Sequence, residues 1–289
     1  MDDAGAKRIR LREHLNKPDI LIAPGVYDLV SATIADTFGF PALYITGFGV
    51  SASHLGLPDA GLLTYTDMEA RVRRMAGATK TPMIADADTG FGGLVNVRAA
   101  VRGYEAAGLA GIQLEDQEFP KKCGHTPGRR VIPIEDMVDK LRVAREARED
   151  ANFLIVARTD ARSGYGLDEA LSRGEAYAKA GADVLFIESP ESEAEMERIC
   201  RSFDLPLLAN MVEGGSTPVL DKARLRELGY RIAIYPVTGL LAAAAALATA
   251  YRRLAGEADA AEVPLYPFKD FCRMIGFEEV WDLERRYAR

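Results

Sequence analysis

The stretch AAGLAGIQLED (residues 106–116) carries a pattern that returns later in the chain as KAGADVLFIES (179–189). Each stretch starts with the end of an amphipathic helix, passes through a glycine suited to a helix C-cap, and enters an apolar run that closes on an acidic residue. The apolar residues follow one another instead of alternating with polar ones, which indicates strands buried on both faces, as in a parallel sheet. The two stretches therefore predict a repeated helix–strand unit.

Eight apolar runs of this kind occur along the chain, and amphipathic stretches such as NVRAAVRGYEAAG (96–108) lie between most of them. The runs are ILIAPG (20–25), ALYITG (42–47), PMIADAD (82–88), GIQLEDQ (111–117), FLIVARTD (153–160), VLFIESP (184–190), PLLANMV (206–212) and RIAIYPV (231–237). Eight strand–helix units within about 250 residues predict an α/β protein with a (β/α)8 TIM barrel. A doubly wound open sheet is the main alternative, but no glycine fingerprint follows the first run.

The chain is expected to form one domain over residues 1–289, because no change in composition marks a second. The barrel is predicted over about residues 18–255, with an extra helix over 4–16 before it and a helical extension over about 256–289 after it. The alanine-rich run GLLAAAAALATA (239–250) is too short to span a bilayer, and we expect it to form a buried helix.

Composition and charge exclude several classes of protein. The chain has 289 residues, of which 48% are hydrophobic, and its formal net charge of −7 argues against a nucleic-acid partner. The three cysteines, Cys123, Cys200 and Cys272, are odd in number and widely separated, so they indicate neither a disulfide framework nor a zinc site. Together with a charged N-terminus that does not resemble a signal peptide, they predict a cytoplasmic protein without membrane contact.

Polar side chains collect where the predicted strands end, which is where barrel enzymes place their active sites. The residues at these ends are Thr46, Gly47, Asp86, Asp88, Glu115, Asp116, Arg158, Asp160, Glu188 and Asn210. Any one of them could simply cap a helix. Their recurrence at one end of six strands indicates a common site, because a core does not tolerate so many unpaired charges.

The segment ADADTGFGG (85–93) is the most specific of these strand ends. Asp86 and Asp88 lie two apart on a strand, so their side chains share a face and repel each other unless a cation joins them. Oxygen ligands with room for water favour Mg²⁺, or Mn²⁺ as a substitute, over zinc. Asp59 and Glu115 could complete an outer shell through water. Two helix caps beside a glycine loop are the alternative interpretation.

Two further motifs supply positive charge. Arg158 suits a carboxylate clamp, since its guanidinium meets a carboxylate in two parallel hydrogen bonds, although an ion pair with Glu188 would also explain it. The segment PKKCGH (120–125) places two lysines, a thiol and an imidazole side by side. A basic surface loop with an incidental cysteine is the simplest interpretation of that segment, so other motifs must give Cys123 a role.

Five motifs, taken in order, resemble those of the isocitrate lyase/phosphoenolpyruvate mutase superfamily. They are YITGFGVSASHLGLPD (44–59), ADADTGFG (85–92), EDQEFPKKCGH (115–125), VARTDAR (156–162) and ANMVEGG (209–215). The resemblance runs from about residue 18 to 255. The KKCGH form resembles the carbon–carbon lyase branch, since mutases and phosphonopyruvate hydrolases of the superfamily generally lack that cysteine. The resemblance implies a barrel whose final helix is exchanged between the subunits of a homotetramer, a dimer of dimers.

The resemblance also implies ligands for a metal and for a 2-oxo-acid product such as pyruvate. Mg²⁺ would be ligated by Asp88, with Asp86 and Glu115 reaching it through water. The carboxylate of the oxo acid would be held by Arg158 and the Thr46–Gly47 backbone. The residues lining the place of the second fragment would be Gly124, His125, Glu188 and Asn210.

The implied chemistry is cleavage of a 2-hydroxy acid that carries a carboxylate on C3. The bond between C2 and C3 breaks once the hydroxyl loses a proton, and Mg²⁺ favours this by stabilising the developing alkoxide. Tyr44 is the candidate for handling that proton. The other fragment leaves as an enolate-like dianion, whose charge Lys121, Lys122 and His125 offset. Cys123 would then protonate its carbon.

Departures from the family pattern point to the substrate. Where relatives that cleave tricarboxylates carry an arginine, this sequence has Leu241, and Lys269 is the only cation near the other expected position. Burying an unpaired third carboxylate is costly. Phe48, where methylisocitrate lyases carry glycine, also suits a smaller or more apolar substrate.

The sequence therefore resembles lyases acting on 2-alkyl- or 2,3-dialkylmalates, the 2,3-dimethylmalate and petal-death type, which would yield pyruvate or another 2-oxo acid plus a monocarboxylate. Three alternatives stay open. They are cleavage of 2-methylisocitrate, hydrolysis or decarboxylation of oxaloacetate, and a catalytically silent barrel that binds oxo acids.

Overall fold

Parallel strands form the centre of the fold in the computed structural model, which describes residues 3–124, 128–257 and 261–288. Within these residues the sheet has eight strands in the order β6-β5-β4-β3-β2-β1-β8-β7. They are β1 (Leu21–Val26), β2 (Leu43–Ile45), β3 (Met83–Asp86), β4 (Gly111–Glu115), β5 (Leu154–Thr159), β6 (Val184–Ile187), β7 (Leu208–Asn210) and β8 (Ile232–Tyr235). A parallel bridge between Leu185 and Leu207 joins the two outer strands, so the sheet is a nearly closed barrel. The predicted barrel is confirmed.

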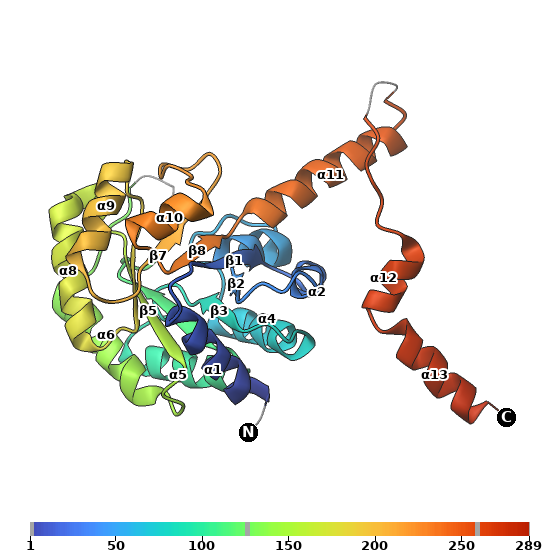
Figure 1. Ribbon diagram of the computed structural model, residues 1–289, viewed down its shortest axis with the longest axis horizontal. Coiled ribbons are helices and arrows are strands. Elements are labelled where there is room, and N and C mark those ends of the chain that lie inside the picture. Colours follow the sequence, from blue (N-terminus) through green and yellow to red (C-terminus); the bar gives the residue numbers. More distant parts are fainter. Residues whose placement is uncertain (1–2, 125–127, 258–260, 289) are drawn as a thin grey trace. The chain divides into compact units, whose positions relative to one another are not determined.

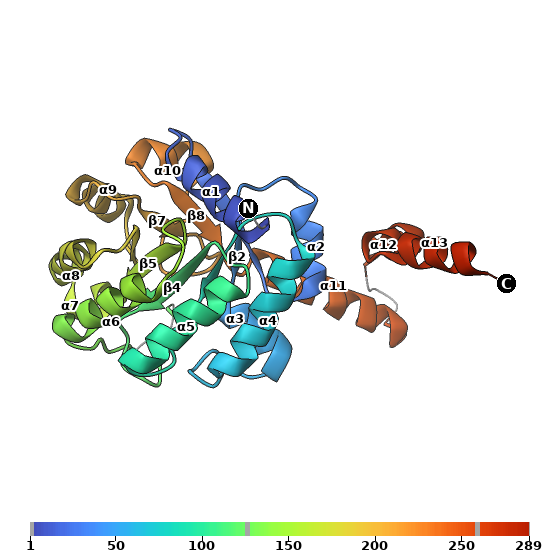
Figure 2. The ribbon, with the colours of Figure 1, turned by 90° about the horizontal axis from the view of Figure 1, so that it is seen from below.

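Helices surround these strands (Figures 1 and 2). They are α1 (Asp3–Leu15), α2 (Leu29–Asp36), α3 (Gly47–Val50), the π-helix η1 (Ser51–Leu55), α4 (Tyr65–Ala78), α5 (Leu94–Ala106), α6 (Ile134–Ala147), α7 (Arg162–Tyr165), α8 (Leu167–Ala180), α9 (Glu193–Ser202) and α10 (Lys222–Leu228). Three more helices follow in the chain, α11 (Thr238–Leu254), α12 (Phe268–Met274) and α13 (Phe277–Tyr287). Both faces of the strands are buried, because alternate side chains point to the helices and to the barrel interior.

The helix α1 closes the N-terminal end of the barrel, as the prediction of an extra helix over 4–16 required. Leu11 and Leu15 belong to the same apolar cluster as the inward-facing side chains of the strands. On the same helix, Lys7 Nζ donates to the carbonyl oxygens of Ala76 (3.0 Å) and Thr79 (2.7 Å), at the end of α4. Cations stabilise helix C-termini, so these contacts hold α1 in place. The C-terminal end of the barrel is not covered by α1, so a functional site can lie there.

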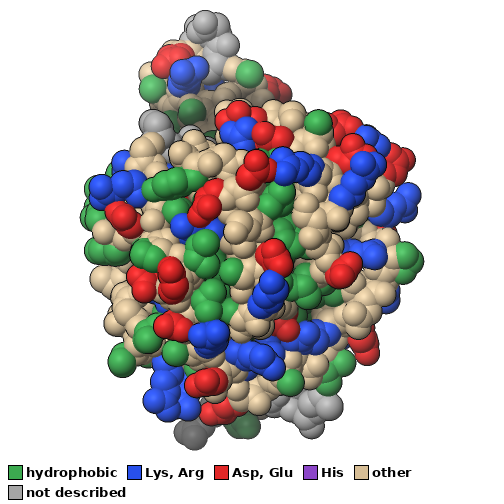
Figure 3. Space-filling model, turned by 90° about the vertical axis from the view of Figure 1, so that its left-hand side faces the viewer, with side chains coloured by type: hydrophobic (Ala, Val, Ile, Leu, Met, Phe, Trp, Pro, Cys, Tyr) green, Lys and Arg blue, Asp and Glu red, His purple; other side chains and the backbone are tan. Residues whose placement is uncertain are grey.

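The outer face of the helical layer carries charges of both signs. Lys179 pairs with Glu175 on α8, and Arg201 pairs with Glu197 on α9. Figure 3 shows acidic and basic side chains interspersed over this side of the molecule, which lies at the left in Figure 1. Exposed pairs of this kind are screened by solvent, so they keep the helices solvated more than they stabilise the fold.

The chain divides into two compact units, Met1–Leu240 and Leu241–Arg289. The division falls inside α11, earlier than the start of the C-terminal extension expected at about residue 256. The prediction that the alanine-rich run forms a buried helix is wrong for the single chain, because α11 contains no buried residue. Leu240 packs against the core cluster, whereas Leu241 is 48% exposed and Leu247 is 51% exposed. No helix of the described chain is both long and apolar enough to cross a bilayer.

Candidate active site

The strand ends bring the predicted polar residues into one buried cluster at the C-terminal end of the barrel. Thr46 and Gly47 follow β2, and the strands β3 to β7 end in or beside the others. Their side chains are almost inaccessible to solvent. The residues are Thr46, Gly47, Asp86, Asp88, Glu115, Arg158, Glu188 and Asn210. Contacts between neighbouring strand ends, described below, connect them into one network.

The aspartates after β3 face the loop that follows β2. Asp88 has a positive φ of 48°, which is uncommon for a residue other than glycine, and its backbone N–H donates to Asp86 Oδ1 (3.0 Å). A side chain at Gly47 would come within 2.8 Å of Asp86 Oδ2, so only glycine allows this approach of backbone to carboxylate. Thr46 caps α3 by accepting a hydrogen bond from the N–H of Gly49, and Phe48 is half-buried on that short helix.

Lys121 carries positive charge from the PKKCGH segment into this cluster. Its Nζ lies 2.6 Å from Asp59 Oδ1 and 2.7 Å from Asp88 Oδ1, and the side chain is 3% exposed. Burial disfavours the charged amine, but Asp88 and Asp59 outweigh that effect and raise the pKa of Lys121 well above its usual value. The lysine is therefore an ammonium ion that bridges two carboxylates.

Burial also acts on the carboxylates of the cluster. It raises the pKa of Asp88 to about 7, although Lys121 opposes the change. Burial raises the pKa of Glu115 well above its usual value too, against the effect of Arg158. Burial is the largest cause of both shifts, and a divalent cation would favour the ionised carboxylates.

The donor set fits a hard divalent cation. Six carboxylates and three basic side chains of the described chain meet here, and they are Asp59, Asp86, Asp88, Glu115, Asp160 and Glu188 with Lys121, Arg129 and Arg158. Glu115 Oε1 is buried and has no hydrogen-bond partner in the described residues. In the same part of the chain, no three His, Cys, Asp or Glu residues converge as direct ligands. That arrangement suits Mg²⁺, which keeps several waters and binds through one or two carboxylates.

Arg158 is held from several sides. Its Nε and Nη2 donate to the two oxygens of Asp160 at 2.9 and 2.8 Å, and its Nη2 lies 3.3 Å from Glu188 Oε2. The guanidinium carbon lies 5.1 Å from the centre of the Phe186 ring, within the range of a cation–π contact. Burial opposes its charge, but Asp160 and Glu188 raise the pKa of Arg158 well above its usual value. The ion pair with Glu188 is therefore present, and the role of Arg158 as a carboxylate clamp stays a prediction.

The described part of the KKCGH segment, residues 121–124, lies against this arginine. Gly124 is buried, and a side chain at that position would collide with Arg158 Nη2 and Glu188. Ser189 Oγ donates to the Gly124 carbonyl at 3.0 Å. Cys123, next to it, is half-buried. The two lysines separate, because Lys122 is exposed and its Nζ donates to the carbonyl of Gly128 (3.0 Å).

Two predicted residues of the site remain, Asn210 and His125. Asn210 Nδ2 donates to Glu188 Oε2 at 3.1 Å, which places both residues beside the Arg158 clamp. His125 lies outside the described residues, so its role stays a prediction.

Tyr44 contacts the site through a residue that the sequence did not single out. Its hydroxyl donates to Gln113 Oε1 (2.8 Å), and Gln113 Nε2 donates to Asp86 Oδ1 (3.3 Å). Burial and Asp86 raise the pKa of Tyr44 well above its usual value, so the phenol is protonated at neutral pH. Tyr44 thus positions Asp86, and its part in moving a substrate proton stays a prediction. Gln113 could have been found, because it is a polar residue inside an apolar strand, two before Glu115.

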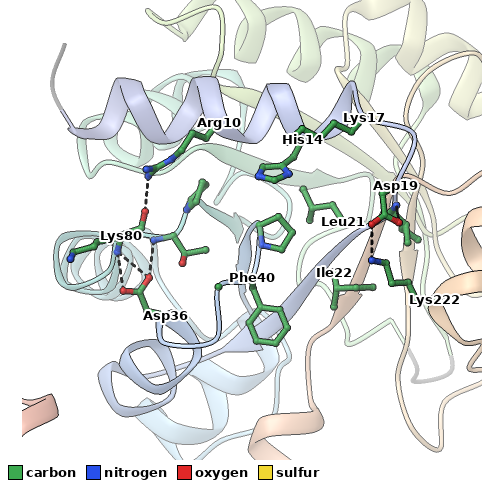
Figure 4. A pocket seen from close by; sticks show the side chains of 15 residues that line it. Arg10, His14, Lys17, Asp19, Leu21, Ile22, Asp36, Phe40, Lys80 and Lys222 are labelled. Atoms are coloured by element: carbon green, nitrogen blue, oxygen red, sulfur yellow. Dashed lines mark hydrogen bonds and ion pairs between the residues drawn. The ribbon is translucent and has the colours of Figure 1, made fainter.

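A large cavity of about 690 Å³ lies at the other end of the barrel, between α1 and the starts of β1, β2 and β3. Figure 4 shows that polar groups around it pair with one another. Arg10 donates to the carbonyl of Lys80, Asp36 accepts from the N–H of Lys80, and Lys222 pairs with Asp19 at 2.8 Å. None of the predicted site residues lines this cavity, so it is not the candidate active site.

Comparison with known sequences adds to this geometry. The family model for phosphoenolpyruvate phosphomutase matches residues 11–255. The 2,3-dimethylmalate lyase of Eubacterium barkeri is 48% identical over 281 residues, which cover 96% of this chain and 97% of that protein. The 2-methylisocitrate lyase of Aeropyrum pernix is 43% identical over 280 residues, covering 96% of this chain and 89% of that one.

Solved structures show the same fold over almost the whole chain. An oxaloacetate acetylhydrolase in complex with 3,3-difluorooxalacetate has a TM-score of 0.90 at 33% identity and covers 98% of this chain and 97% of its own. A 2,3-dimethylmalate lyase has a TM-score of 0.90 at 34% identity, with coverages of 100% and 96%. A phosphonopyruvate hydrolase in complex with oxalate and Mg²⁺ has a TM-score of 0.85 at 33% identity, with coverages of 98% and 99%.

Proposed function

The chain belongs to the phosphoenolpyruvate mutase/isocitrate lyase superfamily, and from this membership we propose that it cleaves a 2-alkyl- or 2,3-dialkylmalate, with Mg²⁺ bound, to a 2-oxo acid and a monocarboxylate. Its relatives include carbon–carbon lyases, and it is an enzyme of that class. One observation carries the proposal: residues 121–124 of the KKCGH segment meet the carboxylate cluster and Arg158, with Lys121 on Asp88 and Gly124 against Arg158.

A malate with small alkyl groups is favoured over a tricarboxylate. The relative that is 48% identical over nearly its whole length is named for 2,3-dimethylmalate. In the sequence, Leu241 takes the position at which relatives that cleave tricarboxylates carry an arginine, and Phe48 adds an apolar surface beside Thr46. A third carboxylate without a partner would be costly to bury, whereas methyl groups gain from contact with an aromatic ring.

The chain's own residues orient the half of the substrate that becomes the oxo acid. Arg158 and the Thr46–Gly47 backbone bind its carboxylate, and the fixed guanidinium sets the orientation of the C2–C3 bond. When bound, Mg²⁺ supplies Lewis-acid stabilisation of the charge that develops on the C2 hydroxyl oxygen. Asp88 would hold it directly, with Asp86 and Glu115 reaching it through water.

Cleavage then balances as a retro-aldol step. A base takes the hydroxyl proton, and the electron pair left on the oxygen forms the C2 carbonyl. The electrons of the C2–C3 bond stay on C3. The departing fragment is the enolate-like dianion of a monocarboxylate. The positive charge of Lys121 offsets that charge, and the thiol of Cys123 gives its proton to C3. The resulting thiolate regains a proton after the products leave.

Substrate choice tests this proposal. 2,3-Dimethylmalate should be cleaved with a kcat/KM at least about tenfold above that for 2-methylisocitrate, because one unpaired carboxylate costs more than 1.4 kcal/mol. Leu241→Arg should lower the ratio of kcat/KM for 2,3-dimethylmalate to kcat/KM for 2-methylisocitrate, because the new arginine favours the tricarboxylate. Leu247→Arg, on the same helix and similarly exposed, is the matched control and should leave the ratio unchanged. A wild-type enzyme that prefers 2-methylisocitrate would refute the argument from the missing arginine, and another cation such as Lys269 must then bind the third carboxylate.

Oxaloacetate hydrolysis is the second candidate, because the structure of an oxaloacetate acetylhydrolase has a TM-score of 0.90 to this chain. The same metal and the same arginine would serve it, with water attacking the C2 carbonyl. Its products are oxalate and acetate, so an assay for pyruvate against oxalate distinguishes the two reactions.

We also propose that the enzyme is a homotetramer in which C-terminal helices pack on a partner subunit. The second unit supports this, since it exposes a row of large apolar side chains. On α13 these are Phe277, Val280, Trp281 and Leu283. Rows of this kind on an amphipathic helix are typical of a face covered by another chain.

A further inference from the structure

Asp160 is a buried carboxylate to which the mechanism above gives no role. It follows β5, two residues after Arg158, and is 2% exposed. Asp160 Oδ2 accepts from Arg158 Nε at 2.9 Å and Oδ1 accepts from Nη2 at 2.8 Å. Two parallel hydrogen bonds of this kind fix the plane of a guanidinium as well as its position. Within residues 3–124, 128–257 and 261–288, the hydrogen bonds and ion pairs of Arg158 use Nε and Nη2, which leaves Nη1 for a substrate carboxylate.

A second network fixes the backbone of Asp160. Its N–H donates to Asp116 Oδ1 at 2.9 Å. Asp116 Oδ2 accepts from Thr159 Oγ1 (2.7 Å), from the hydroxyl of Tyr177 (2.7 Å) and from Arg173 Nη1 (3.1 Å). Tyr177 and Arg173 belong to α8, so this network ties Asp160 to the helical layer. Asp160 cannot follow Arg158 if the arginine moves.

Two other carboxylates compete for the same arginine. Glu115 Oε2 lies 3.4 Å from Arg158 Nε, and Glu188 Oε2 lies 3.3 Å from its Nη2. Both distances are longer than those to Asp160. Without Asp160, Arg158 would close on one of these glutamates, because a buried guanidinium needs a carboxylate partner. Arg158 would then be turned away from the substrate carboxylate. It would also form an ion pair with a glutamate that the reaction needs.

Arg129 is a second cation on Asp160. Its side chain is 5% exposed, and its Nη1 donates to Asp160 Oδ1 at 2.7 Å. Its Nη2 donates to Ser189 Oγ at 3.3 Å, and the same hydroxyl donates to the carbonyl of Gly124. Burial opposes the ionisation of Asp160, but Arg158 and Arg129 outweigh it and lower the pKa of that carboxyl. Arg129 thereby keeps Asp160 charged and joins it to the KKCGH segment.

We propose that Asp160 is a positioning residue that holds Arg158 open toward the 2-oxo-acid carboxylate, and that Arg129 supports it by sharing its Oδ1. This inference rests on the proposed function, because the ligand it concerns is the oxo-acid half of the substrate. It assigns specificity for a carboxylate at C1 to the pair Arg158–Asp160 together instead of to the arginine alone.

Calorimetric titration of the Mg²⁺-loaded full-length protein with pyruvate tests the proposal. Asp160→Asn should weaken pyruvate binding by about 10- to 100-fold. Changes of this size are typical when a residue that orients a directly binding side chain is replaced. The KM for substrate should rise by a similar factor, with a smaller change in kcat, while Mg²⁺ affinity stays at the wild-type value. Asp183→Asn is the matched control, since Asp183 pairs with Arg12 and Arg148 away from the site and should leave pyruvate affinity unchanged.

Variants of Arg129 decide the matter if Asp160→Asn does not fold. Arg129→Gln leaves Asp160 in place and should weaken pyruvate binding by about tenfold, and Arg129→Lys should restore most of the affinity by returning the charge. If Asp160→Asn binds pyruvate as tightly as the wild type, the inference about Asp160 is overturned and the proposed function is not. If Asp160→Asn is unfolded, wild-type pyruvate affinity in Arg129→Gln has the same meaning. A wild-type protein that binds neither pyruvate nor oxalate overturns the proposed function, and this inference with it.

Discussion

Asp88→Ala should reduce turnover on the order of 10³-fold or more, because the variant loses the one carboxylate expected to touch the metal directly. Asp88 lies in the centre of the cluster, 2.7 Å from Lys121 Nζ and hydrogen-bonded through its backbone to Asp86. Titration with Mg²⁺, or with Mn²⁺ followed by electron paramagnetic resonance, should show the loss of binding. Activity and metal binding should be lost together.

The fold of this variant should persist. Asp88 is not part of the apolar core, and its removal relieves repulsion from Asp86 and Asp59 while Lys121 keeps Asp59 as a partner. We expect the free energy of unfolding to change by about 1 kcal/mol or less. Asp36→Ala, at the other end of the barrel, should retain turnover. Wild-type Mg²⁺ affinity in Asp88→Ala would show that the metal is held elsewhere.

Cys123→Ser should lower kcat by about 10²- to 10⁴-fold, the range expected when a positioned proton donor is lost. A hydroxyl is a far weaker acid than a thiol, so the serine cannot deliver a proton to the departing carbanion in time. The side chain is half-buried beside Gly124, whose backbone lies against Arg158 and Glu188. Steady-state kinetics on 2,3-dimethylmalate measure the effect.

Binding and stability separate this role from the simpler interpretations of Cys123. Mg²⁺ and pyruvate should still bind, and the free energy of unfolding should change by less than about 1 kcal/mol. Cys200→Ser is the matched control: burial raises the pKa of the Cys200 thiol to about 12, it lies on α9 away from the site, and turnover should be unchanged. Near-normal kcat in Cys123→Ser would make the segment an ordinary basic loop and leave His125 or water as the proton source.

The fold was predictable because each strand is marked locally. Continuous apolar runs bounded by helix ends placed every strand, and the runs over 111–117 and 184–190 exceed β4 and β6 only at their C-terminal ends. The excess has a physical reason. The last residues of each run, such as Asp116 and Glu188, still donate backbone hydrogen bonds to β5, while their side chains bond to the residues that build the site and its support.

The parts that could not be predicted depend on contacts between segments far apart in sequence. Lys121 and Lys122 are equivalent in the sequence, yet one bridges Asp59 and Asp88 while the other is exposed. Asp160 was visible as a strand-end carboxylate, but nothing local shows that two arginines share it. For the alanine-rich run of α11 the predicted helix is correct and its predicted burial is wrong. Composition sets the helix propensity of a segment, but it does not supply the surface that would cover the helix.

The most direct test of the central claim is product analysis of 2,3-dimethylmalate, supplied as a mixture of all stereoisomers, incubated with the enzyme in Mg²⁺ and in EDTA. Nuclear magnetic resonance follows the substrate and both products in the same tube. The proposed mechanism predicts pyruvate and propionate in equal amounts with Mg²⁺ and neither product in EDTA. Failure to form pyruvate from this substrate together with failure to form the corresponding 2-oxo acid from any 2-alkylmalate, or an equal rate of cleavage in EDTA, would contradict it.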